Sequence, residues 1–164
     1  MRIFFLIFLV FFMACSEKKQ QPPSLQEQDS ISFNESNFIK PEKSPFFYKE
    51  LLKIQQQIIH NPRERIYREA YIVNAYIDNN NALISLGSAR TKDPESGTEI
   101  NPVMAKRAAL IDAKRWAVYG LLWLNNDFKP EFGKISEQYS GVFKELYSFN
   151  HNDSLTIAIA TRVR

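Results

Sequence analysis

Residues 101–124 read NPVMAKRAALIDAKRWAVYGLLWL, and this stretch decides the fold of the chain. Asn101 and Pro102 open a long helix. Alanine then recurs at every fourth position, so that one side of the helix carries small side chains. A helix with such a side can bring its backbone close to a sheet, and we predict that it does so here. The alanines are Ala105, Ala109, Ala113 and Ala117.

The opposite side of this helix is also apolar. Ile111, Val118 and Leu122 lie about 180° from the alanines on a helical wheel. A helix with two apolar faces is usually covered on both, so the second cover is the next helix of the chain or a partner. Trp123 stands near the end of the helix, where a large aromatic side chain could anchor an interface. These four residues form the candidate interface.

Three segments are predicted to form the sheet. Residues 66–77 and 82–90 are rich in β-branched and aromatic side chains, and residues 78–81 between them, DNNN, tolerate left-handed backbone angles. This pattern predicts a β-hairpin. Residues 154–164 alternate between apolar and polar side chains, which is the pattern of a half-buried strand.

Two further helices are predicted. Ser44 suits a helix cap and Pro45 the first helical position, and an apolar stripe follows them. A second apolar stripe at helical spacing runs through residues 134–149, before a turn at residues 150–153. The expected fold class is α+β. A small antiparallel sheet, made of the hairpin and the C-terminal strand, is packed by the Ala-rich helix and the further helices in one domain over residues 44–164.

Residues 1–14 are expected to be a lipoprotein signal peptide. Arg2 precedes an apolar run over residues 3–13, which is shorter than the roughly 20 residues that a membrane-spanning helix needs and matches the apolar region of a signal peptide. Ala14 is the small residue before the cleavage point, and Cys15 is the only cysteine of the chain. The segment resembles a lipobox, in which the cysteine becomes the acylated first residue. The alternative is a plain signal peptide, or an uncleaved anchor, with an incidental cysteine.

A lipid on Cys15 predicts where the protein resides. Fatty acyl chains such as palmitate contribute about 0.8 kcal/mol per buried methylene, so two or more hold a protein stably on a membrane. Ser16 after the cysteine favours the outer over the inner membrane of a bacterial envelope. Residues 15–43 are polar and contain three prolines, which predicts a lipidated flexible tether that gives the domain reach into the periplasm.

Composition and motifs argue against several classes of function. The formal net charge of +3 is too small to indicate a nucleic-acid partner. His60 and His151 are the only histidines and are expected in turns, without the matched spacing that metal ligands need. The sequence contains no recognisable nucleophile motif and no glycine-rich phosphate loop. We therefore expect no enzymatic activity, no metal and no cofactor.

Three segments resemble the bacterial lipoprotein-20 family, named for a twenty-kilodalton outer-membrane lipoprotein. Residues 82–89, ALISLGSA, are similar to its apolar strand, and residues 105–115, AKRAALIDAKR, to its helix of repeating alanine and arginine. Residues 157–160, IAIA, resemble its closing strand. The resemblance covers residues 82–164, while the aromatic stretch 116–123 departs from the family's more polar helix end. It implies an α+β envelope domain that binds or assembles with other proteins, with no catalytic residues to carry over.

Two functions follow from these expectations. The first is a membrane-anchored envelope lipoprotein that acts as a non-enzymatic interaction or assembly module, with an envelope protein or a second copy of the chain as its partner. The alternative is a lipoprotein that binds a small ligand or glycan in an aromatic pocket near Trp116 and Trp123. An exposed second apolar face would favour the first function, and a pocket lined by the two indole rings would favour the second.

Overall fold

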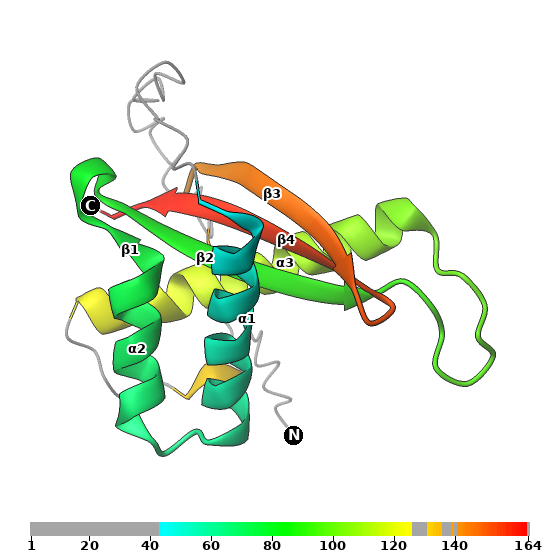
Figure 1. Ribbon diagram of the computed structural model, residues 1–164, viewed down its shortest axis with the longest axis horizontal. Helices are drawn as coiled ribbons and strands as arrows, with labels where there is room; N and C mark the ends of the chain where they lie inside the picture. Colours follow the sequence, from blue (N-terminus) through cyan, green and yellow to red (C-terminus); the bar gives the residue numbers. More distant parts are fainter. Residues whose placement is uncertain (1–42, 126–130, 136–138, 140, 164) are drawn as a thin grey trace, which may run out of the picture. The chain divides into compact units, whose positions relative to one another are not determined.

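The alanine side of the long helix lies on a β-sheet in the computed structural model of the chain (Figure 1). This helix, α3, spans Pro102–Leu124, and the side chain of its cap Asn101 accepts a hydrogen bond from the Val103 backbone N–H at 2.9 Å. The structure describes residues 43–125, 131–135, 139 and 141–163, which all belong to one compact unit of the chain. Within these ranges, three helices and a four-stranded antiparallel sheet form a small α+β fold, which confirms the predicted class.

The sheet has the strand order β1-β2-β4-β3. Its two central strands, β2 (Ala82–Arg90) and β4 (Ser154–Arg162), pair along their whole length, from Ala82 opposite Arg162 to Arg90 opposite Ser154. Both were predicted as strands. Most of their residues are buried, because α3 covers one face of this pair and aromatic side chains pack on the other.

Glycine and alanine allow α3 to approach β2 without intervening side chains. A Cβ atom built on Gly87 of β2 would overlap the backbone nitrogen of Ala113 and the carbonyl oxygen of Ala109. The helix backbone therefore touches the strand backbone at this point. Around it, Ala109 and Ala113 form a small buried cluster with Ile157 and Ile159 of β4.

Two shorter helices stand as an antiparallel pair beside β2 (Figure 1). The first, α1 (Pro45–His60), begins where Ser44 and Pro45 predict it, and the Ser44 hydroxyl accepts a hydrogen bond from the Phe47 N–H at 3.4 Å. The second, α2 (Arg65–Ala75), follows after a short turn. The pair buries its inner side chains against each other and the sheet; they are Tyr48, Leu51, Gln55 and Ile58 of α1 and Tyr71 and Ala75 of α2.

The edge of β2 that faces this helix pair is closed by three side chains. Residues 84, 86 and 88 alternate along β2 and present their backbone groups away from β4. The Tyr71 hydroxyl donates to the Ile84 carbonyl at 3.4 Å, and the Gln55 side-chain amide donates to the Leu86 carbonyl at 3.0 Å. The Asp112 carboxylate accepts a hydrogen bond from the Ser88 N–H at 3.0 Å. Side chains from α2, α1 and α3 thus replace a neighbouring strand.

The predicted strand over residues 66–77 is wrong for most of its length, since that segment forms α2. Its buried residues, Tyr71 and Ala75, are four positions apart, which is a helical spacing. The β-branched and aromatic residues favour a strand locally, but packing against α1 and α3 decides the helix. Only β1 (Tyr76–Ile77) pairs with β2, and the turn between them ends at Asn81 with the left-handed φ of 44° that its residue type tolerates.

The predicted helix over residues 134–149 is also wrong for the part of it that the structure describes. A 3-10 turn, η3 (Phe132–Lys134), is followed by an edge strand, β3 (Phe143–His151), which pairs with β4. The pairing register shifts between Glu145 and Tyr147, which marks a β-bulge. A bulge adds one residue to a strand, so the apolar residues on its two sides fall at spacings that resemble those of a helix. The predicted turn at residues 150–153 is confirmed at Asn152 and Asp153, which have φ values of 46° and 53°.

The predicted signal peptide (1–14), Cys15 and residues 16–42 of the tether lie outside the described residues. Among the helices that the structure describes, none combines the length and the apolar character that spanning a membrane requires.

Candidate interaction surface

The first half of α3 exposes apolar side chains on the side that faces away from the sheet. Val103 is 73% exposed, Met104 59% and Ile111 44%. They share one side of the helix because Ile111 follows Met104 by seven positions and Val103 by eight, which is about two helical turns. Arg107 lies between them on the same side and is also exposed. We call Val103, Met104, Arg107 and Ile111 the outer face of α3.

Basic side chains flank the outer face. Lys106 pairs with the Glu145 carboxylate of β3 at 3.1 Å. The Lys114 ammonium lies 4.4 Å from the ring centre of Phe143, and the Arg115 guanidinium lies 5.0 Å from the ring centre of Phe132. These contacts hold the three flanking cations beside the helix.

The single acidic residue of α3 is turned away from this face. Asp112 points towards β2, where it accepts the Ser88 N–H, and burial raises the pKa of its carboxyl above the ordinary value. The outer face of α3 therefore combines apolar side chains with cations and carries no carboxylate of its own helix.

The four residues of the predicted interface do not form one exposed surface. Ile111 is exposed and Leu122 is half-buried, but Val118 and Trp123 are only 8% and 5% exposed and belong to the core. The second half of α3 is thus covered by the chain itself, although not by the helix predicted for residues 134–149. The exposed part is centred on Ile111 and continues towards Val103 and Met104, which the sequence reasoning missed.

Trp116 and Trp123 lie in a cluster of packed rings. Trp116 stacks on Phe132 with ring centres 3.8 Å apart, and Tyr119 meets Trp116 edge to face at 5.5 Å. The Arg68 guanidinium of α2 lies 5.4 Å from the Trp123 ring centre. These neighbours occupy the space around the two indoles, and burial raises the pKa of the Tyr119 hydroxyl.

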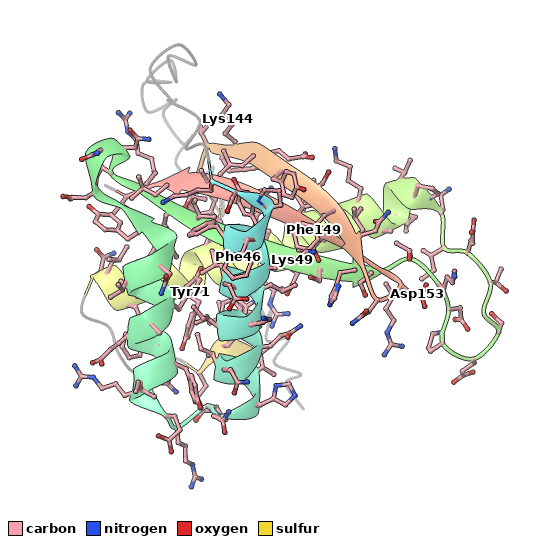
Figure 2. The ribbon with its side chains drawn as sticks, in the orientation of Figure 1. Phe46, Lys49, Tyr71, Lys144, Phe149 and Asp153 are labelled. Atoms are coloured by element: carbon pink, nitrogen blue, oxygen red, sulfur yellow. The ribbon has the colours of Figure 1, made fainter. Side chains whose placement is uncertain are left out.

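A second apolar surface lies on α2, on the side opposite to its buried residues. Ile66 and Val73 are 66% and 79% exposed and are seven positions apart, so they share this side. Arg65 and Glu69 beside them form an ion pair at 2.6 Å. We call Ile66 and Val73 the outer side of α2. The charges of Arg65 and Glu69 beside it compensate each other, whereas the outer face of α3 itself carries the cation Arg107. Figure 2 shows that Tyr71, in contrast, points from α2 into the interior.

A groove of about 400 Å³ lies at the beginning of α3. The Lys92 ammonium at its border pairs at 3.1 Å with Asp153, which is labelled in Figure 2. Asp153 lies in the turn between β3 and β4. The lining mixes polar and apolar side chains from the loop after β2, from α3 and from the sheet, and includes Thr91, Glu99, Ile100, Pro102 and Leu155. This composition does not indicate a particular reaction.

The two histidines lie at the ends of two different elements. His60 ends α1, where its Nδ1 lies 2.7 Å from the Gln56 carbonyl oxygen. His151 ends β3, where its Nε2 lies 3.0 Å from the Asn152 side-chain nitrogen. In the part of the chain that the structure describes, no three His, Cys, Asp or Glu side chains are grouped so that they could hold a metal ion.

Comparison of the chain with protein-family models, with curated proteins and with solved structures finds no match.

Proposed function

We propose that this protein is a lipid-anchored lipoprotein of the bacterial envelope that acts as a non-enzymatic interaction module. One observation carries the proposal: the only cysteine, Cys15, directly follows Ala14 and the apolar run of residues 3–13. Acylation of that cysteine would anchor the chain after the leader is removed. The serine that follows it favours the outer membrane.

Exposed apolar surfaces on the folded domain support an interaction role. The outer side of α2 carries Ile66 and Val73 next to an ion pair whose charges compensate each other. Such a surface, apolar and without excess charge, suits a protein partner better than a charged ligand. The resemblance to the lipoprotein-20 family over residues 82–164 also favours protein binding. However, residues 143–151 within this range form a strand, whereas the sequence predicted a helix there.

Mass spectrometry of the protein extracted from membranes tests the anchor. We expect a mature chain that begins at Cys15 and carries fatty acyl groups, and a Cys15→Ala variant that is released from membranes. An intact leader, or a first residue without lipid, contradicts the proposal.

Photo-crosslinking in intact cells tests the interaction role. A photoreactive amino acid at Val73 should yield a discrete crosslinked species, which an Ile66→Asp substitution in the same chain should remove. The matched control places the photoreactive group at Lys53 of α1, an exposed residue whose ammonium pairs with Glu50. Equal crosslinking from both positions, or none from Val73, counts against a protein partner on α2.

The alternative, a ligand-binding lipoprotein with a pocket near Trp116 and Trp123, has less support. The two indoles pack against Phe132, Tyr119 and Arg68. A ligand there would have to displace these contacts.

A further inference from the structure

We propose that the outer face of α3 rests on an anionic phospholipid surface. The inference depends on the proposed function, because a lipid on Cys15 is what holds the domain next to a bilayer. It adds the orientation of the domain, with α3 towards the lipid headgroups and the outer side of α2 free for a protein partner.

The chemistry of the outer face matches a membrane interface. Helices that lie in such an interface place apolar side chains at the boundary of headgroups and acyl chains, and basic side chains next to lipid phosphates. Val103, Met104 and Ile111 supply the apolar part. Arg107 on the same face and Lys114 on its flank supply cations. Lys106 and Arg115 lie beside them, the first paired with Glu145 and the second attracted by Asp112. Lys114 and Arg115 contact aromatic rings of β3 and η3, which fixes their positions and leaves their charges in place. The charge of Lys106 is compensated by the Glu145 carboxylate of β3.

The rest of the fold presents this face as a rigid surface. The opposite side of α3 is fixed on β2 at Gly87, where the two backbones touch. Asp112 is drawn towards the Ser88 N–H and its charge also attracts Arg115, so lipid phosphate would meet mainly Arg107 and Lys114. A bilayer would therefore meet a preformed apolar and cationic surface, with no folding step on contact.

Charge decides between a bilayer and a second copy of the chain. Two copies that paired through this face would place Arg107 and its basic neighbours against the same residues of the partner, while the carboxylates nearby, Glu145 and Asp112, already act on Lys106 and Arg115. An anionic lipid surface offers phosphate to Arg107 and Lys114. The occupant that complements the face is therefore lipid.

The tether is long enough to allow this orientation. Twenty-eight peptide units join Cys15 to Lys43, the first described residue. At about 3.5 Å each they extend over at most ~100 Å, whereas the 23 residues of α3 are about 35 Å long. The domain can thus turn any side to the bilayer, and the lipid anchor gives even a weakly attracted face a high effective concentration of lipid.

A single labelled cysteine tests the orientation in the lipidated full-length mature protein. Acylation blocks the thiol of Cys15, so an Ile111→Cys substitution creates one reactive site for a polarity-sensitive fluorophore. The protein is reconstituted in vesicles of phosphatidylcholine with or without phosphatidylglycerol. The matched control is Val73→Cys, on the outer side of α2. In vesicles that contain phosphatidylglycerol, we expect the fluorophore at position 111 to show a blue-shifted emission and a several-fold lower accessibility to an aqueous quencher. In vesicles without phosphatidylglycerol, and at position 73 in both kinds of vesicle, we expect the fluorophore to remain exposed to water.

A charge variant and a flotation assay separate the possible results. Arg107→Gln in the Ile111→Cys chain should weaken the effect of phosphatidylglycerol, whereas Arg63→Gln in the turn between α1 and α2 should not. Failure of the protein to float with vesicles would refute the lipid anchor itself. If the protein floats with vesicles but the quencher reaches position 111 as readily as position 73, only the proposed orientation is overturned. A further outcome is that protection of position 111 persists in detergent micelles and rises with protein concentration, or that it occurs only in native membranes. Either result identifies a protein on this face and also overturns the proposed orientation.

Discussion

β2 is enclosed in two different ways, on its face by α3 and at its edge by the side chains of three helices. On the face, Gly87 lacks a side chain, and the backbones of Ala109 and Ala113 occupy the space. At the edge, Tyr71, Gln55 and Asp112 extend to the backbone groups of alternate residues. The packing on the face depends on Gly87 having no Cβ atom. The closure of the edge depends on single hydrogen bonds. The face should therefore be far more sensitive to one substitution than the edge.

The largest effect is expected from Gly87→Ala. Its Cβ would overlap backbone atoms of α3, which cannot move aside as a side chain can. The helix would have to leave the sheet, and we expect a loss of about 4 kcal/mol or more in the free energy of unfolding, measured by urea denaturation. Gly133→Ala is the matched control, because a Cβ there meets no atom within 4 Å, and it should change stability by less than about 0.5 kcal/mol. Similar losses in both variants would show that the close approach of α3 is not what matters.

A smaller effect is expected from Asp112→Ala at the edge. The substitution removes the acceptor of the Ser88 N–H and leaves that group without its partner in a partly buried position. Losing the partner of a buried donor costs about 1–3 kcal/mol. Asp112→Asn keeps an acceptor oxygen and should retain most of the stability at pH 7. Equal destabilisation by alanine and asparagine would mean that the hydrogen bond contributes little.

Tyr71→Phe should cost less again. The hydroxyl donates to the carbonyl oxygens of Ile84 and Trp116 at 3.4 and 3.3 Å, which are long distances for hydrogen bonds. The ring and its packing remain in the variant. We expect a loss of about 1 kcal/mol, seen as a lower urea midpoint with an unchanged slope. A loss as large as that of Gly87→Ala would remove the distinction between face and edge.

The smallest effect concerns pH. Burial raises the pKa of Asp112 above 3.8, so the folded chain keeps this proton where the unfolded chain loses it. The contribution of the protonated Asp112 to the free energy of unfolding is fully present below about pH 3.8. It is lost as the pH rises through the folded-state pKa of Asp112. Relative to the native chain, Asp112→Asn should therefore gain stability as the pH rises from below 3.8 to neutral. Urea unfolding of both chains across this range measures the difference, and a constant difference would contradict the raised pKa.

The sequence predicts those elements whose local signal and final packing agree. Ser44 and Asn101 both cap helices that begin with proline, and the alternation along residues 154–162 matches a strand with one side on α3. The alanine spacing also predicts the close contact with the sheet. It does not identify Gly87 as the contact point, since that depends on the register of β2 against α3.

The wrong predictions arise where distant residues override the local pattern. Tyr71 and Ile72 belong to residue types that favour strands, but α2 gains the burial of Tyr71 between α3 and β2. In β3 the bulge between Glu145 and Tyr147 interrupts the alternation that would have revealed a strand. Both features depend on partners that are remote in the sequence.

Of the four residues of the predicted interface, Ile111 is the exposed one. Its relation to Val103 and Met104 could be read from their spacings of eight and seven positions. The burial of Val118 and Trp123 could not be predicted from the sequence, because the side chains that cover them come from other elements. Arg68 of α2, for example, lies over the ring of Trp123. Membrane attachment through Cys15 stays a prediction.

The occupied edge of β2 has a consequence for how densely these molecules can be assembled. Open strand edges recruit strands of neighbouring molecules and seed fibrils. Here Tyr71, Gln55 and Asp112 take up that edge, and the opposite edge strand, β3, carries a bulge and Lys144, both of which hinder such recruitment. Crowded molecules could therefore diffuse past one another without polymerising through their sheets.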